Sequence, residues 1–101
     1  MRTSGWRLAL LFCVAQFVAA LPSPARAVTE IMWWHAMSGE LGRQLGRLAT
    51  EFNQSQSQYR VIPSYKGNYT ETVTAAIFAF RSRRQPAIVQ VNEIGTATMM
   101  A

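Results

Sequence analysis

Ala87-Ile88-Val89-Gln90-Val91 is the stretch that decides the fold of this chain. A strand with one solvated face alternates apolar and polar side chains, whereas this run is apolar at every position except Gln90. Nearly unbroken apolar runs are typical of strands that are covered on both faces of a parallel sheet. Asn92-Glu93-Ile94-Gly95 then predicts a turn, and Gly95 to Ala101 predicts the opening of a helix.

An amphipathic segment precedes this strand. A helix is expected from about Tyr69 to Arg83, because apolar residues recur there at helical spacing. The predicted inner face has four members: Val73, Ala76, Ile77 and Phe80. Cations favour a helix C-terminus, and three arginines lie in or just past the last turn: Arg81, Arg83 and Arg84. Pro86 prevents the helix from continuing.

Two further strands are predicted upstream, at Thr29 to Trp34 and at Tyr59 to Ser64. The second of them ends near Pro63 and leads into the turn Lys66-Gly67-Asn68. Asn53 to Gln58 forms a polar connector in front of this second strand.

A helix between these two strands is expected from about Gly39 to Asn53. Ser38 is its candidate N-cap, and Glu40 places a negative charge in the first turn, where the helix dipole favours it. Four apolar residues at helical spacing predict the buried stripe: Leu41, Leu45, Leu48 and Phe52. The opposite face is predicted to be solvated and carries Arg43, Gln44, Arg47 and Glu51.

The predicted order of elements is therefore βαβαβα. This order predicts an α/β fold with right-handed crossovers and a parallel sheet. The final residues Met99-Met100-Ala101 are apolar and carry no helix stop signal, and three strands alone would leave sheet edges uncovered. Residues 28–101 are thus expected to form part of a larger lobe.

Residues 1–27 have the three-part plan of a secretory signal peptide. Arg2 and Arg7 supply a basic start, Leu8 to Ala20 is an uncharged stretch too short to span a bilayer, and Ala25-Arg26-Ala27 is a small-residue cleavage site. Cleavage is predicted after Ala27, and an uncleaved signal anchor is the alternative. Export from the cytoplasm is the expected outcome.

The composition narrows the function classes. The chain of 101 residues is 50% hydrophobic and has one cysteine and a formal charge of +5, which excludes an intrinsically disordered protein and a disulfide scaffold. Without residues 1–27 it keeps seven basic residues against five glutamates, a net charge of +2. The remaining basic residues form no stripe beyond Arg81, Arg83 and Arg84, so nucleic acid is not an expected partner.

Polar and aromatic residues collect in the three loops that follow the predicted strands. In open parallel sheets, ligands bind outside these carboxyl ends. Trp34 and His35 lie at the first end, Tyr69 closes the second loop, and Glu93 follows the third strand.

Each of these candidates has a structural alternative. For Trp34 the two hypotheses are contact with a ligand and packing in the core. For His35 they are contact with a ligand and a hydrogen bond to backbone at the strand end. Tyr69 binds a ligand or packs at the turn. Glu93 points into the ligand crevice or serves as an N-cap. Glu40 is predicted to be only a helix-start charge.

Catalytic and metal-binding patterns are absent from the sequence. It has no nucleophile elbow, no phosphate-binding glycine loop, no aspartate and one histidine. A pair of His35 and Glu93 as acid and base is the one arrangement that would make an exported hydrolase. No metal site and no cofactor are expected, and capture of a small solute is the favoured function.

Three runs at these loops resemble a known family: Trp34-His35-Ala36-Met37-Ser38-Gly39-Glu40-Leu41-Gly42, Val61-Ile62-Pro63-Ser64-Tyr65-Lys66-Gly67-Asn68-Tyr69, and Pro86 to Ala101. They resemble the amino-terminal part of the sn-glycerol-3-phosphate-binding branch of extracellular solute-binding protein family 1. This family supplies the periplasmic components of bacterial ABC importers. The resemblance implies a two-lobed fold that closes over sn-glycerol-3-phosphate or glycerophosphodiesters and delivers them to ABC transporter permease subunits.

The same resemblance implies that Tyr69 and Glu93 contact the ligand. Trp34 and His35 are candidate neighbours of the ligand because they lie at the first strand end. It also implies that most phosphate-binding groups lie beyond Ala101, and it marks Asn92 as a departure where some relatives carry an aromatic residue. Two other readings remain: a phosphoester hydrolase lobe that uses His35 and Glu93, and a nonfunctional truncated remnant.

Overall fold

A computed structural model describes Leu21 and residues 26–101 of the chain. The predicted signal peptide, residues 1–27, therefore lies almost wholly outside the described residues. The elements follow one another in the order β1 (Thr29–His35), α1 (Gly39–Ser55), β2 (Tyr59–Tyr65), α2 (Tyr69–Arg81), β3 (Ile88–Val89) and α3 (Glu93–Met100). The predicted α/β class and βαβαβα order are confirmed.

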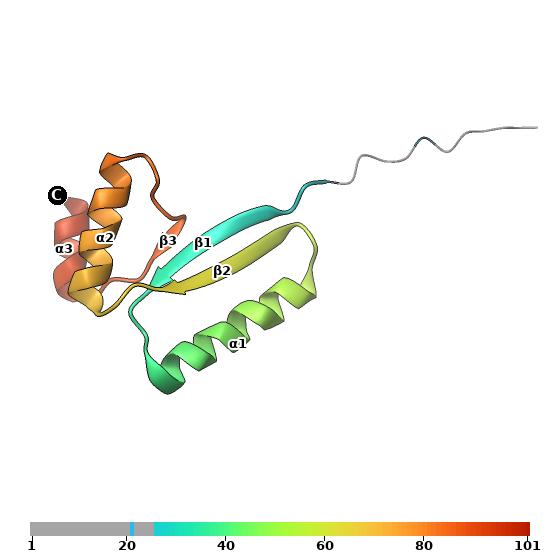
Figure 1. Cartoon of the computed structure of the whole chain (residues 1–101), viewed down its shortest axis with the longest axis horizontal. Coiled ribbons are helices and arrows are strands. Elements are labelled where there is room, and N and C mark those ends of the chain that lie inside the picture. Colours follow the sequence, from blue (N-terminus) through green and yellow to red (C-terminus); the bar gives the residue numbers. More distant parts are fainter. Residues whose placement is uncertain (1–20, 22–25) are drawn as a thin grey trace, which may run out of the picture.

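The three strands form one parallel sheet with the order β2-β1-β3. The step from β1 to β2 and the step from β2 to β3 run in opposite directions across the sheet. Right-handed crossovers therefore place α1 on one face and α2 on the other. Figure 1 shows this arrangement, with α1 on one side of the β1–β2 ribbon and α2 and α3 together on the other. The carboxyl end of β1 is the point at which the connections diverge.

Strand β2 forms an outer edge of the sheet that the chain covers with its own side chains. The Asn53 amide donates to the Val61 carbonyl at 2.9 Å and accepts from the Val61 N–H at 2.7 Å. The Gln56 amide does the same for Tyr59, with both distances 2.7 Å. Pro63 has no N–H to leave unpaired. This edge therefore presents few free backbone groups to another strand.

Strand β3 is shorter than predicted. The expected strand covered Ala87 to Val91, but only Ile88 and Val89 pair with β1. The expected burial on both faces is also wrong, because Ile88 is 44% exposed. Within residues 26–101, β3 has a strand neighbour on one side only, so its other edge receives no ladder hydrogen bonds.

Helix α1 meets the sheet through a different stripe from the predicted one. Leu45 is half-buried and Ala49 is buried, but Leu48 is 60% exposed, and Leu41 and Phe52 are exposed too. The reason lies in the polar anchors of α1, since Asn53 and Gln56 continue the stripe that Leu45 and Ala49 begin. These anchors rotate the helix away from the predicted leucine face.

Helix α2 packs through small side chains. Its buried residues are Thr72, Ala76 and Ala79, whereas Phe80, predicted on the inner face, is 69% exposed. Small residues let the helix approach the sheet closely, and Phe80 lies one position beyond Ala79, about 100° around the helix. Among the helices of residues 26–101, none combines the length and apolar character needed to cross a bilayer.

Candidate functional site

The candidate site lies at the carboxyl edge of the sheet, where the loops after the three strands meet α1, α2 and α3. The turn between β2 and α2 fixes its first part. Gly67 adopts φ +98°, which strongly favours glycine, and a Cβ atom there would collide with the Glu71 carboxylate. The turn is therefore built around Gly67.

A capping box begins helix α2. The Asn68 side chain accepts a hydrogen bond from the Glu71 N–H at 2.9 Å, and the Glu71 carboxylate accepts from the Asn68 N–H at 2.7 Å. These reciprocal bonds satisfy two backbone donors at the helix start. They fix the backbone on both sides of Tyr69, the first residue of α2.

The start of helix α3 differs from the prediction by two residues. The helix begins at Glu93, and Asn92 is the N-cap, since its side chain accepts from the Gly95 N–H at 2.9 Å. Glu93 is therefore not the N-cap that the sequence left open as an alternative. Its side chain is exposed in the first turn, where the helix dipole favours a carboxylate.

Helices α2 and α3 border a partly open cavity of about 250 Å³. Gly95 brings the helices close, because a Cβ atom there would lie 3.0 Å from the Val73 side chain. The cavity is lined by Tyr69, Thr70, Val73, Thr74, Ile77, Asn92, Ile94, Gly95 and Thr98. The fold thus brings Tyr69 to the same cavity as Asn92 and Ile94, the two residues that flank Glu93.

His35 is placed differently from Tyr69 and Glu93. Its side chain is buried, with 5% of the residue exposed, and its Nδ1 accepts a hydrogen bond from the Met37 N–H at 3.3 Å. The Trp33 and Tyr65 rings lie 6.2 and 6.0 Å away between centroids. This environment matches the structural alternative for His35, a histidine that bonds to backbone at a strand end.

Trp34 points to the opposite face of β1 from Trp33 and His35, as strand alternation requires. It is half-buried, and the Lys66 ammonium lies over its ring at 4.4 Å from the centroid. The indole face next to the carboxyl edge is therefore already in contact with a cation of the same chain.

The sequence left open an acid-base pair of His35 and Glu93. The side-chain hydrogen bonds of the described residues include none between His35 and Glu93, and the first is buried while the second is exposed. Residues 26–101 and Leu21 contain no group of three or more His, Cys, Asp or Glu that could hold a metal ion.

Two polar residues at this edge were not singled out from the sequence. The Gln90 side chain accepts from the Ala36 N–H at 3.0 Å, and its backbone N–H donates to the Trp34 carbonyl at 2.9 Å. Gln90 thereby links the loops after β1 and β3. The sequence feature that could have identified Gln90 is a polar residue within an apolar run. The second residue is Lys66, and the sequence distinguishes it only by its place in a predicted turn.

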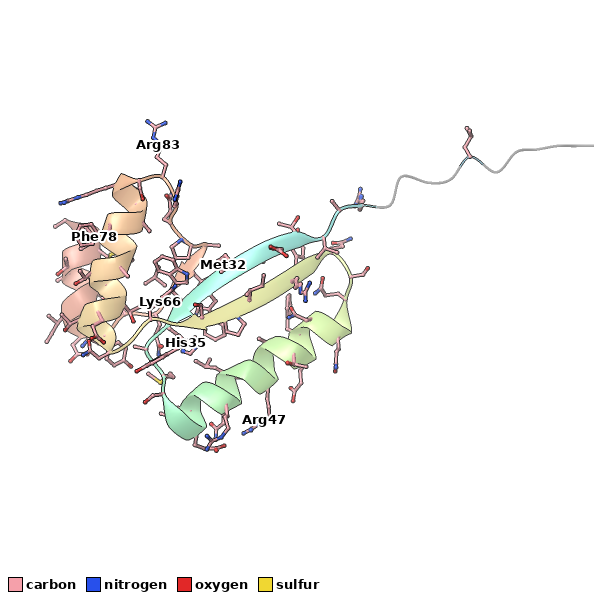
Figure 2. All side chains as sticks on the ribbon, in the orientation of Figure 1. Met32, His35, Arg47, Lys66, Phe78 and Arg83 are labelled. Carbon is pink, nitrogen blue, oxygen red and sulfur yellow. The ribbon has the colours of Figure 1, made fainter. Side chains whose placement is uncertain are left out.

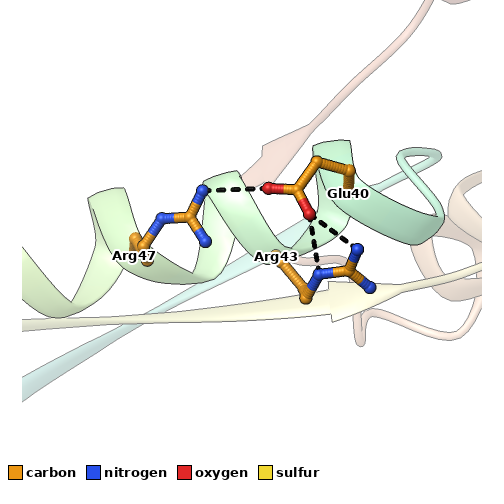
Figure 3. Close-up of polar contacts among 3 residues, drawn as sticks. All are labelled: Glu40, Arg43 and Arg47. Carbon is orange, nitrogen blue, oxygen red and sulfur yellow. Dashed lines mark hydrogen bonds and ion pairs between the residues drawn. The ribbon is translucent and has the colours of Figure 1, made fainter.

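Glu40 has the structural role predicted for it. Its carboxylate accepts from the Arg43 Nε and NH2 groups at 2.9 and 2.6 Å and from Arg47 at 3.1 Å (Figure 3). The Arg43 and Arg47 guanidinium groups lower the pKa of Glu40 below its ordinary value. The predicted N-cap, Ser38, occupies the cap position, but its side chain makes no capping hydrogen bond.

Several known proteins are similar to this chain. No family model matches it. It is 56% identical over 89 residues to the sn-glycerol-3-phosphate-binding periplasmic protein UgpB of Yersinia enterocolitica, and 53% identical over 89 residues to that of Yersinia pestis; each match covers 88% of this chain. The protein of the same name from Escherichia coli O1:K1 is 52% identical over 82 residues, 81% of this chain.

The chain spans about a fifth of the length of these relatives, with 20% of both Yersinia proteins and 19% of the Escherichia coli protein aligned. The resemblance identified from the three loops is confirmed by these matches. Over most of its length, the chain is similar to the periplasmic sn-glycerol-3-phosphate-binding proteins of these bacteria.

Proposed function

We propose that this chain supplies the amino-terminal part of a periplasmic solute-binding protein that captures sn-glycerol-3-phosphate for an ABC importer. The observation that carries the proposal is the 56% identity, over 88% of the chain, to a relative named for that ligand. In this proposal residues 1–27 are a cleaved signal peptide, and residues 28–101 form part of the first of two lobes. The permease subunits of the importer are the partners, and glycerophosphodiesters are further ligands.

Tyr69 and Glu93 are the proposed ligand contacts. Tyr69 lines the cavity at the carboxyl edge, and Glu93 lies in the exposed first turn of α3 beside it. An ionised carboxylate repels a phosphate dianion at close range, so Glu93 is assigned to the glycerol hydroxyls, from which it accepts hydrogen bonds. The Tyr69 hydroxyl can donate to or accept from either end of the ligand.

A binding function is favoured over the exported hydrolase. The hydrolase would need His35 as an acid or base at the ligand, but this imidazole is buried and bonded to the Met37 N–H. The relatives named in the comparison are binding proteins, which agrees with capture rather than turnover. A carrier returns its ligand unchanged.

The test uses a chimera in which residues 28–101 of this chain replace the corresponding residues of the Yersinia enterocolitica relative. The chimera is expected to bind sn-glycerol-3-phosphate in a calorimetric titration. Tyr69→Phe should weaken binding about threefold to tenfold through loss of one hydrogen bond, and Glu93→Gln about tenfold to a hundredfold through loss of a charged one. Tyr59→Phe and Glu51→Gln, which are exposed and distant from the carboxyl edge, are the matched controls.

Two further measurements cover the rest of the proposal. Glycerophosphodiester incubated with the chimera should be recovered intact, and released alcohol would favour the hydrolase. Protein recovered from a periplasmic extract of the source bacterium should begin at Val28 in a mass-spectrometric reading of its N-terminus. A chimera that folds and binds no glycerol phosphate would overturn the proposed function.

A further inference from the structure

Lys66 holds an unusual position at the carboxyl edge. Its backbone N–H donates to the His35 carbonyl at 3.0 Å, which ties the residue to the end of β1. Its ammonium lies over the Trp34 ring, 4.4 Å from the centroid. Figure 2 shows Lys66 and His35 at the end of the β1–β2 ribbon from which the chain turns toward α2. Tyr69 follows three residues later.

No carboxylate neutralises this ammonium among the described residues. The ion pairs of residues 26–101 all use Glu40, with Arg43 and Arg47 as its partners. Glu71, the acidic side chain nearest to Lys66 along the chain, is engaged by the Asn68 N–H. The Lys66 ammonium contacts the face of the Trp34 indole. An indole attracts a cation less strongly than a carboxylate or phosphate attracts it.

The other described cations lie elsewhere or are paired. Arg26 precedes β1 and Arg60 is near the start of β2, both at the amino end of the sheet. Arg81 lies at the far end of the 13-residue helix α2, about 20 Å from its start, and Arg83 and Arg84 follow it. Arg43 and Arg47 are held by Glu40. Within the part of the chain that the structure describes, Lys66 is thus the carboxyl-edge cation that is not paired with a carboxylate.

The strand order places opposite charges on the two flanks of β1. Lys66 follows β2 and Glu93 follows β3, and these strands lie on either side of β1 in the order β2-β1-β3. Two strand spacings, about 10 Å, therefore separate the ends from which the two residues leave the sheet. A ligand with an anionic end and a hydroxyl end matches this polarity in one orientation only.

We propose that Lys66 leaves the Trp34 ring to contact the phosphate of the ligand, which orients the ligand across the sheet edge with its glycerol hydroxyls toward Glu93. The inference rests on the proposed function and adds a specificity-determining residue to it. An ammonium suits a phosphate as a compact point charge with three donors. In this proposal the Trp34 ring binds the Lys66 ammonium when no ligand is present, and the ligand does not stack on it.

The test measures affinity of the same chimera for sn-glycerol-3-phosphate at several salt concentrations. Lys66→Gln should weaken binding about tenfold and flatten the salt dependence, because a charged contact is lost and salt screens charged contacts. Lys66→Arg should restore most of the affinity, whereas Lys66→Met, which keeps an apolar stem of similar length and lacks the charge, should bind as weakly as Lys66→Gln. Arg60→Gln removes an equal charge at the amino end of the sheet and should leave affinity unchanged.

A second readout follows the indole itself. In chimera labelled with 5-fluorotryptophan, the Trp34 fluorine resonance, assigned with Trp34→Phe, should shift when ligand is added and should not shift in Lys66→Gln. If Lys66→Gln binds as tightly as the unmodified chimera while Tyr69→Phe and Glu93→Gln bind more weakly, the Lys66 inference is overturned and the proposed function stands. If the unmodified chimera binds no ligand, both are overturned.

Discussion

The two flanks of the sheet are built differently. On the β2 flank, Asn53 and Gln56 bond both backbone groups of Val61 and Tyr59, so α1 closes the edge beside it. On the β3 flank two residues pair with β1, and the space between α2, β3 and α3 holds a cavity of about 530 Å³. That cavity is bordered by apolar side chains that include Phe80, Val89 and Met99.

The β2 edge is covered by residues that are near it in the sequence, whereas within the described residues the β3 edge has no such cover. Asn53 lies eight residues from Val61, so the closed edge is specified within one βαβ unit. Among residues 26–101, β3 pairs with a strand on one side only. The sequence-based expectation of uncovered sheet edges is therefore correct for β3 and wrong for β2. Substitutions in the chimera can test this contrast.

The largest effect is expected in the turn that ends the β2 flank. Gly67→Ala places a Cβ against the Glu71 carboxylate at a φ of +98°, which breaks the capping box and strains the backbone. A loss of about 3 kcal/mol in the local opening free energy of α2 is expected, measured by hydrogen exchange of the Glu71 amide. Gly46→Ala, within α1 and facing open space, should stabilise its helix instead. Equal effects of the two substitutions would contradict this account of the turn.

The second largest effect is expected when the Asn53 side chain is removed from the edge of β2. Asn53→Ala leaves the N–H and carbonyl of Val61 without their partners, at an expected cost of about 2 kcal/mol. The Val61 amide should then exchange about 30-fold faster. The exposed neighbour substitution Gln54→Ala should have no such effect. An Asn53→Ala chimera in which the Val61 amide exchanges no faster than in the unmodified chimera would contradict this account of the β2 edge.

A gain in stability is expected where α2 passes to the β3 flank. The Arg83 N–H donates to Phe80 and the Arg84 N–H to Ala79, the pattern of a Schellman motif, with Arg83 at φ +58° in the position that favours glycine. Figure 2 shows the Arg83 side chain projecting away from the sheet. Arg83→Gly should raise stability by about 1 kcal/mol in thermal unfolding. Arg84→Gly is the control, and a destabilising Arg83→Gly would contradict the assignment.

The smallest effect concerns the exposed ion pairs of α1. Arg43 first, and then Arg47, lower the pKa of Glu40 below its ordinary value of 4.5. This contribution to stability is present above pH 4.5 and is lost as the pH falls through the lowered pKa. Glu40→Gln should therefore lower the unfolding midpoint slightly at pH 7 and low salt, with a smaller difference at pH 3. A difference that grows toward pH 3 would contradict the stated cause.

Sequence patterns predicted the order and type of all six described elements because local signals are strong there. The strand near Thr29, the Lys66-Gly67-Asn68 turn and the helix stop near Pro86 each rest on neighbouring residues. The patterns failed where partners outside a segment decide the outcome. The length of β3 depends on strands beside it, and the rotation of α1 depends on the bonds from Asn53 to Val61.

The candidate site shows the same division. Tyr69 and Glu93 were proposed as ligand contacts because they follow strand ends and match the family resemblance. That Tyr69 lines one cavity with Asn92 and Ile94, the neighbours of Glu93, depends on the packing of α2 against α3. Asn92 was predicted within a turn, yet its capping bond to Gly95 moves the start of α3 and places Glu93 inside the first helical turn. The contact between Lys66 and Trp34 joins residues 32 positions apart, so no local pattern could predict it.

We propose that the carboxyl edge presents Tyr69 and Glu93 to sn-glycerol-3-phosphate. The most direct test is a crystal structure of the chimera grown with that ligand. We expect a bound ligand whose glycerol hydroxyls lie within hydrogen-bonding distance of the Glu93 carboxylate. An oxygen at either end of the ligand should also contact the Tyr69 hydroxyl. A ligand bound with both side chains facing bulk solvent would contradict it.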